Sequence, residues 1–342
     1  MNKQTKVGRR TAPPPRKRLF LSALIVLAGF TALELGARCW LFGRRGLNFS
    51  YVNSLRSFGR ADLLRASPAP EVHYELRPNL NLRFQGVHFQ TNAWGMRNPP
   101  ASLDKPGDCF RLAIVGDSPA MGWGVQVHDS FPALLQEDLN DSDTGTRFEV
   151  LNFAVAGYGL WNYLATARHK ALPFNPDLLL VTFTLEDLQI PTRSEHRKRT
   201  YVKKSKSYPG WHSFLWKLLN GMGKHRQIAD YHEQLNRSSL PSEQLQSLEE
   251  LCREFARFAE DHHVPVVFVC LKLDEPRPPF LQQWQELMEQ SGFLFLDTAS
   301  EFPEASFADF FLHPLDRHPN EEAHRRYARS ILQGLLQAQW LP

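Results

Sequence analysis

The sequence predicts an α/β fold in which helices cover both faces of a mostly parallel sheet. Five short apolar runs are bounded by turn residues and are typical of buried strands: 110–115, 148–153, 178–184, 265–270 and 293–297. Apolar residues recur at helical spacing in 243–263 and 320–337. Strands that are apolar on both faces and alternate with helices form parallel sheets, so we expect three layers.

A basic tail precedes this region. Residues 1–18 contain seven basic residues and no acidic one, so the rest of the chain has 33 Lys and Arg residues against 36 Asp and Glu residues. The remainder therefore has a slightly negative net charge. A nucleic-acid-binding domain needs a basic face on its folded part, so we expect no nucleic-acid partner.

The tail leads into an apolar segment that predicts a transmembrane helix over 19–43. The uninterrupted run 19–33 covers roughly 22 Å as a helix, which is short of the ~30 Å hydrocarbon core. The segment continues after Glu34 and Arg38, which are four residues apart and can pair. The basic tail then predicts a cytoplasmic N-terminus and a domain outside the cytoplasm, which is the periplasm in a Gram-negative cell. A cleaved signal peptide is the alternative, but no clear cleavage site follows, which favours an uncleaved single-pass signal anchor.

The rest of the chain divides into a membrane-proximal segment, 44–108, and the α/β domain, 109–342. Residues 189–240 interrupt the α/β alternation with an insertion, and its stretch 193–206 contains seven Lys and Arg residues but only Glu195 as an acid. A solvated loop is the ordinary interpretation. A lid over a site, or a patch that attracts an anionic polymer or lipid, is the functional alternative. The four cysteines are scattered and predict no metal site.

Ser118 is the first candidate for chemistry. It follows the strand 110–115 in "VGDSPAMGWGV" and precedes a helical pattern at 130–140, so we expect it on a strand-to-helix turn at the carboxyl edge of the sheet. A hydroxyl at a helix N-terminus lies where backbone N–H groups stabilise an anion. The alternative is that Ser118 only caps a helix, a position where serine is common.

Asp316 and His318 are the candidate partners of Ser118. They lie in one loop near the end of the chain, ahead of a helix that Pro319 and Asn320 can open. A serine nucleophile needs a base, and the base needs an acid that orients it. The alternative is that Asp316 caps the helix while His318 is a surface residue. His313 and His324 are nearby but less well placed relative to an acid.

With these residues in order, the sequence resembles the SGNH/GDSL hydrolases, and among them the membrane-anchored bacterial branch. "VGDSPAMGWGV", "LNFAVAGYGLWNY", "PDLLLVTFTLEDL" and "DRHPNEEAH" resemble successive conserved blocks, and "YELRPN" with "TNAWGMRNP" resembles the branch's leading segment. The resemblance implies a three-layer, flavodoxin-like sandwich. It also implies Ser118 as nucleophile, His318 as base, Asp316 as acid and the N–H groups of Ser118 and Gly157 in an oxyanion hole, with neither cofactor nor metal.

Two positions depart from the family pattern. Ala323 stands where the family often has Gly, and this exchange is harmless inside a helix. The departure at Glu186 bears on activity. The third block normally ends in Asn-Asp, where the Asn donates to the oxyanion, but this chain has Glu186-Asp187. A carboxylate cannot donate unless it is protonated, and loss of one such donor costs about 10²–10³ in rate. We therefore expect a serine esterase or O-acyltransferase acting on acyl esters of envelope or exported glycans or of lipids. The alternative is a catalytically weak or inactive protein that binds a glycan or an envelope assembly partner.

Overall fold

The computed structural model describes residues 15–55, 63–142, 145–188, 191–198, 213–221, 241–273, 277–302 and 307–342. All five expected strands are present in one parallel sheet: β5 (Cys109–Val115), β6 (Arg147–Asn152), β7 (Leu178–Phe183), β8 (Val266–Cys270) and β9 (Leu294–Asp297). The strand order is β6-β5-β7-β8-β9. This order is that of flavodoxin-like folds, in which the chain reverses direction beside the first strand and ligands bind at the carboxyl ends. The expected fold class is confirmed.

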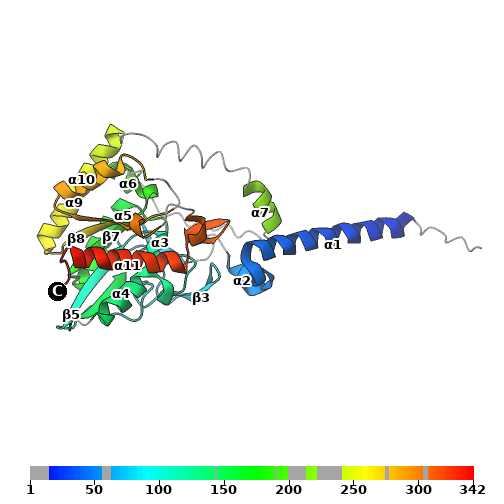
Figure 1. Cartoon of the computed structure of the whole chain (residues 1–342), viewed down its shortest axis with the longest axis horizontal. Coiled ribbons are helices and arrows are strands. Elements are labelled where there is room, and N and C mark those ends of the chain that lie inside the picture. The colour runs from blue at the N-terminus through cyan, green and yellow to red at the C-terminus, as the bar shows by residue number, and fades with distance from the viewer. Residues whose placement is uncertain are drawn as a thin grey trace, which may run out of the picture.

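Helices cover both faces of the sheet (Figure 1). Helix α4 (Phe131–Asp141) packs against β6 and against the C-terminal helix α11 (Glu321–Gln337). The other helix group contains α5 (Leu160–Thr166), α9 (Ser242–His262) and α10 (Leu281–Gln290), with α9 between the other two. The apolar stripe of α9 is buried through Leu248, Leu251 and Phe255, as its periodicity predicts.

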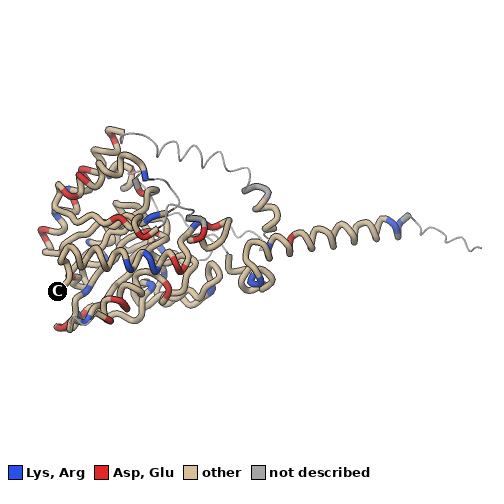
Figure 2. The backbone as a smooth tube through the Cα atoms, in the orientation of Figure 1, with Lys and Arg blue, Asp and Glu red and all other residues tan. Residues whose placement is uncertain are grey.

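The N-terminal apolar segment forms one helix, α1 (Pro15–Phe42), followed by a 3-10 turn (Gly43–Leu47) and a short helix, α2 (Phe49–Ser54). The segment from Arg18 to Leu47 is long and apolar enough to cross a membrane by length and composition, and most of it is exposed. Figure 2 shows that α1 is uncharged between the blue residues at its N-terminal end and a red and a blue position near its other end. These two positions are Glu34 and Arg38, which form the expected pair, with Arg38 Nε donating to Glu34 Oε1 at 2.9 Å.

The segment 44–108 contributes small antiparallel pairs rather than a long helix. Strand β1 (Leu64–Ala66) pairs with β2 (Tyr74–Leu76), and β3 (Asn81–Phe84) pairs with β4 (Val87–Gln90). Leu76, Phe84 and Phe89 are fully buried in the same apolar core as the parallel sheet. The segment therefore packs on the α/β domain as part of its core.

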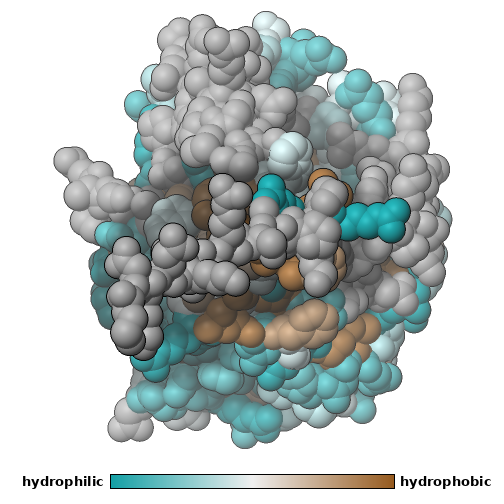
Figure 3. Space-filling view, turned by 90° about the vertical axis from the view of Figure 1, so that its right-hand side faces the viewer, coloured by the Kyte–Doolittle hydropathy of each residue, from teal (hydrophilic) through white to brown (hydrophobic). Residues whose placement is uncertain are grey.

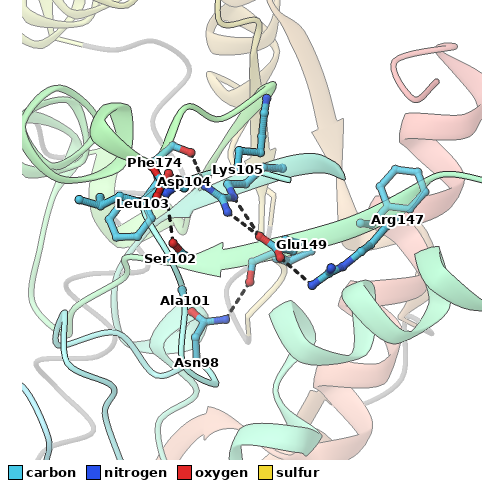
Figure 4. Close-up of polar contacts among 12 residues, drawn as sticks. Asn98, Ala101, Ser102, Leu103, Asp104, Lys105, Arg147, Glu149 and Phe174 are labelled. Carbon is cyan, nitrogen blue, oxygen red and sulfur yellow. Dashed lines mark hydrogen bonds and ion pairs between the residues drawn. The ribbon is translucent and has the colours of Figure 1, made fainter. Parts of the chain in front are cut away.

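A buried arginine ties this segment to the sheet (Figure 4). The guanidinium of Arg111 in β5 donates two hydrogen bonds to Glu149 Oε2, at 2.7 and 3.0 Å, and others to the carbonyls of Phe174 and Leu103. Arg147 binds the second oxygen of Glu149. A buried charge is tolerated only when it is paired and hydrogen-bonded, so Arg111 needs all of these partners. The carbonyl of Leu103 is one of them, and this hydrogen bond holds Leu103 against the sheet.

The insertion 189–240 lies mostly outside the described residues. Its described parts are α6 (Arg193–Lys198), preceded by residues 191–192, and α7 (Phe214–Gly221), preceded by Ser213. Arg193 at the start of the expected charge run binds Glu254 of α9 at 3.1 Å. Most of the run, and with it the expectation of a lid, falls outside the described residues.

Candidate active site

Ser118 lies just beyond the carboxyl end of β5. The turn is tight at Gly116, where a Cβ atom would lie 2.2 Å from Thr182 Oγ1 of the neighbouring strand. Ser118 is the first residue of a one-turn helix, α3 (Ser118–Met121), and Asp117 occupies the N-cap position. Ser118 therefore lies on a strand-to-helix turn, as expected, but the helix is α3 and not the helical pattern at 130–140. Gly122 adopts a left-handed conformation that ends α3, and α4 begins only at Phe131.

Asp316 and His318 lie in a strand and not in the expected loop. Strand β11 (Asp316–Pro319) pairs with β10 (Phe311–His313) in an antiparallel ladder that has an irregular register. Residues two apart in a strand project to the same side, so the spacing Asp-x-His places both side chains on one face of β11. The helix cap is Asn320, whose side chain accepts from the backbone N–H groups of Glu322 and Ala323, so Asp316 does not cap α11.

The structure brings Ser118, His318 and Asp316 together. His318 Nε2 lies 2.9 Å from Ser118 Oγ, and His318 Nδ1 lies 2.5 Å from Asp316 Oδ1. An ionised carboxylate only accepts hydrogen bonds, so Nδ1 carries a proton and Nε2 is left to accept the proton of the serine hydroxyl. This is the arrangement by which an acid orients a histidine base toward a serine nucleophile.

Trp123 completes the cluster, and the sequence reasoning did not single it out. Its indole Nε1 donates to Asp316 Oδ2 at 2.9 Å, so each oxygen of the carboxylate accepts from a different ring. The indole also stacks on the His318 imidazole, with centroids 4.5 Å apart. Trp123 lies five residues after Ser118 in the motif "VGDSPAMGWGV". This closeness to Ser118 is the one feature of the sequence that could have indicated a role for Trp123 in the site.

The hydrogen bonds to Asp316 determine its charge. Burial by itself raises the pKa of a carboxyl group, but the bonds donated by the His318 ring, by Trp123 and by the His318 backbone outweigh it and lower the pKa of Asp316 to about 2. Asp316 is therefore ionised at neutral pH and stabilises a positive charge on His318 when that ring takes up a proton.

Gly157 and Glu186, the other residues expected at an oxyanion hole, follow β6 and β7, the two strands that flank β5. Gly157 is exposed in the loop after β6 and has φ +80°, and a Cβ atom there would lie 3.0 Å from the Tyr74 hydroxyl. Glu186 lies in a 3-10 turn (Leu185–Leu188) after β7, and its side chain lies outside the described part. Its neighbour Asp187 caps this turn by accepting from Thr184 N at 2.9 Å.

Comparisons with known proteins give matches in structure only. No protein-family model matches the sequence, and no curated protein matches it. Among the similar solved structures is a protein of the lipolytic G-D-S-L family from Desulfitobacterium hafniense DCB-2 (14% identity, 66% of this chain and 99% of that chain, TM-score 0.39). An acetylxylan esterase from Geobacillus stearothermophilus matches at 14% identity over 66% of this chain and 94% of its own (TM-score 0.40). A two-domain esterase active on acetylated mannans matches at 12% identity over 68% and 50% (TM-score 0.41).

Two further buried residues hold the loops of the site. Asn152, at the end of β6, donates to the carbonyl of Ala120 in α3 at 2.8 Å and accepts from Ala154 N. The guanidinium of Arg97 donates to the carbonyls of Met121, Gly122 and Val125, which flank Trp123. Sequence reasoning missed both, because their partners are backbone atoms that a sequence pattern does not reveal.

The two spare histidines have other contacts. His324 is fully buried in α11, and its Nδ1 accepts from Phe131 N at 3.1 Å. Burial lowers the pKa of His324 to about 3, and the positive charges of Arg97 and His318 act in the same direction. His313 lies on β10 and packs against the Phe42 ring at the end of α1. Within the described ranges, no group of three His, Cys, Asp or Glu side chains could hold a metal ion.

Proposed function

We propose that this protein is a serine hydrolase of carboxylic esters, held at the outer face of a membrane by α1. The observation that carries the proposal is the continuous chain of hydrogen bonds from Ser118 Oγ through the His318 ring to the Asp316 carboxylate. A surface serine or a helix cap has no need of an oriented imidazole. A nucleophile does, because its proton must leave as the bond to the substrate forms.

In the first half of the reaction, Ser118 Oγ attacks the carbonyl carbon of the ester and its proton passes to His318 Nε2. The carbonyl oxygen becomes an oxyanion, for which the N–H groups of Ser118 and Gly157 are the proposed donors. When the carbon–oxygen bond to the alcohol breaks, the protonated His318 gives its proton to the leaving alkoxide. The acyl group then remains on Ser118.

In the second half, His318 takes a proton from a water molecule as that water attacks the acyl carbonyl carbon. The bond between this carbon and Ser118 Oγ then breaks, His318 returns the proton to Ser118 Oγ, and a carboxylic acid is released. If a sugar hydroxyl replaces water, the same steps transfer the acyl group to a glycan. We propose esters of envelope or exported glycans, or of lipids, as substrates, because α1 would place the domain outside the cytoplasmic membrane.

The test is ester hydrolysis by the full chain in detergent micelles, with p-nitrophenyl acetate as substrate. We expect Ser118→Ala and His318→Ala each to lower kcat/KM by at least about 10³-fold. A fluorophosphonate probe should label the wild-type protein at the peptide containing Ser118. Matched controls are Ser102→Ala, at an exposed serine, and His128→Ala, at a side chain that is 82% exposed. Labelling of Ser118→Ala to the same extent as wild type would overturn the proposal.

The second candidate is a protein that binds a glycan through the same site without turning it over, and Glu186 is the observation that favours it. An inactive wild-type protein in which Glu186→Asn introduces activity would support this candidate. An active wild type whose rate rises about 10²-fold or more in Glu186→Asn would support a slow esterase. Faster ester consumption on addition of a glycan acceptor would identify a transferase.

A further inference from the structure

The carboxylate of Glu34 in α1 makes contacts that its pairing with Arg38 does not explain. Its Oε1 accepts from the backbone N–H of Phe214 at 3.0 Å, in addition to Arg38 Nε. Its Oε2 accepts from Leu215 N at 3.1 Å and from Ser213 Oγ at 2.9 Å. Three of the four bonds therefore come from the start of α7, about 180 residues along the chain.

Helix α7 packs on the end of α1 (Figure 1). Phe214 is buried, with its ring edge-on to Phe42 at 5.1 Å and the Arg38 guanidinium 5.6 Å from its centroid. Together with Leu41, Phe42 and Leu55 it forms an apolar cluster separate from the main core. The carboxylate at the N-terminus of α7 satisfies N–H groups that a helix leaves unpaired, so the docking is specific in geometry.

Other apolar side chains around this junction are exposed. Trp216 of α7 is 65% exposed and Trp40 of α1 is 64% exposed. Leu47 and Phe49, just after α1, are also exposed. Figure 3 looks at the face from which α1 projects, where brown hydrophobic side chains gather above a teal hydrophilic border. Tryptophan is enriched where a bilayer meets water, since its ring is apolar and its N–H is polar.

The depth of Glu34 explains why it needs α7. Counted from Leu19, Glu34 lies ~22 Å along the helix, which is still inside a hydrocarbon core of ~30 Å. At that depth a charged side chain is costly unless it is paired and fully hydrogen-bonded. We propose that α7 is a second membrane-inserted element, which lies in the outer half of the bilayer beside α1 and is held there by Glu34. This inference depends on the membrane anchorage and orientation proposed for α1.

The inserted pair also touches the hairpin that carries two residues of the site. Phe42 packs edge-on against His313 of β10, with centroids 4.8 Å apart, and β10 pairs with β11, which carries Asp316 and His318. Insertion of the pair therefore holds the β10–β11 hairpin close to the bilayer surface through the contact that the end of α1 makes with β10. That position suits esters presented at the membrane face.

The test places an environment-sensitive nitrobenzoxadiazole label at position 216 of the full chain. Cys39→Ser first removes the exposed cysteine, and the other three cysteines are buried. In vesicles of phosphatidylcholine and phosphatidylglycerol, Trp216→Cys should emit at shorter wavelength than in water. Nitroxide-bearing lipids should quench this emission and aqueous iodide should not. Leu27→Cys in α1 is the positive control. Leu336→Cys, 50% exposed in the last turn of α11, is the negative control, since the C-terminus of the chain lies far from α1 (Figure 1).

The result at position 216 decides the proposal. If the label at position 216 shows the emission and quenching of the label at position 27, the proposal is supported. If it shows those of the label at position 336, the proposal is overturned, even when the label at position 27 lies in lipid. Glu34→Ala should return the emission at 216 toward that in water, and Glu34→Gln should do so less, because its amide oxygen still accepts. The fluorescence readout does not depend on ester hydrolysis, so it fails or succeeds separately from the proposed function.

Discussion

The indole of Trp123 lies parallel to the imidazole of His318, with an interplanar angle of 13° and 4.5 Å between ring centroids, while its N–H binds Asp316. One side chain thus contacts both the proposed base, His318, and the proposed acid, Asp316. The loop that carries Trp123 is held in turn by Arg97, whose guanidinium also lies 4.5 Å from the centroid of Phe89. The geometry of the site therefore depends on the chain ahead of the sheet as well as on the sheet.

Trp123→Phe tests this arrangement, since it keeps a ring for stacking and removes the hydrogen bond to Asp316. A hydrogen bond to a charged group contributes about 1.5–3 kcal/mol, so we expect kcat/KM to fall about 10- to 100-fold. The control is Trp94→Phe, which removes a hydrogen bond from another indole to the carbonyl of Ala101. Equal activities of the two variants would contradict a role for Trp123 in positioning Asp316.

Asp316 makes stability depend on pH in the acid range. Its pKa is about 2 in the folded protein against an ordinary 3.8, so the folded state binds the proton more weakly than the unfolded state. The contribution, about 2 kcal/mol, is therefore present above about pH 4 and is lost as pH falls toward 2. Urea unfolding of wild type and Asp316→Asn at pH 5 and pH 3 should show the larger loss in wild type. Equal losses would contradict the prediction.

His324 makes the free energy of unfolding depend on pH at higher pH values than Asp316 does. Its pKa is about 3 in the folded protein against an ordinary 6.5, so the unfolded chain takes up a proton that the folded chain excludes. The free energy of unfolding should then decrease below pH 6.5, by up to about 1.4 kcal/mol per pH unit. His324→Asn, whose amide oxygen can still accept from Phe131 N, should flatten this slope between pH 6.5 and 5. His128→Asn, at an exposed ring, should leave the slope unchanged.

Arg111 and Arg147 bind the same carboxylate but should differ in importance. The Arg111 side chain is 1% exposed and that of Arg147 is 58% exposed, and both contact Glu149. Arg111→Ala leaves a carboxylate without its buried partner and should reduce the free energy of unfolding by about 3–5 kcal/mol. Arg147→Ala should reduce it by less than about 1 kcal/mol. Chemical denaturation of both variants measures the difference, and similar losses would be inconsistent with it.

Local sequence patterns were sufficient to predict where the strands of the sheet lie and which residue types form the candidate site. The five apolar runs became the five strands of the sheet with ends shifted by one residue or less, since burial on both faces makes such runs distinct. The order of the motifs indicated Ser118, Asp316 and His318 as members of one candidate site. Their spacing did not reveal that Asp316 and His318 lie in a strand, because three polar residues between turn formers give no period-2 apolar signal.

By itself, the sequence determined the α/β fold class, the apolar helix at the N-terminus and the three residues that meet at the sheet edge. Only the tertiary structure decided that Trp123 binds Asp316, that Arg97 holds the loop that carries Trp123, and that Glu34 caps α7. The physical reason is distance along the chain. Periodicity and turn chemistry act between neighbouring residues, whereas a hydrogen-bond partner 24 to 193 residues away is selected by how the packed elements bring polar groups together where water is excluded.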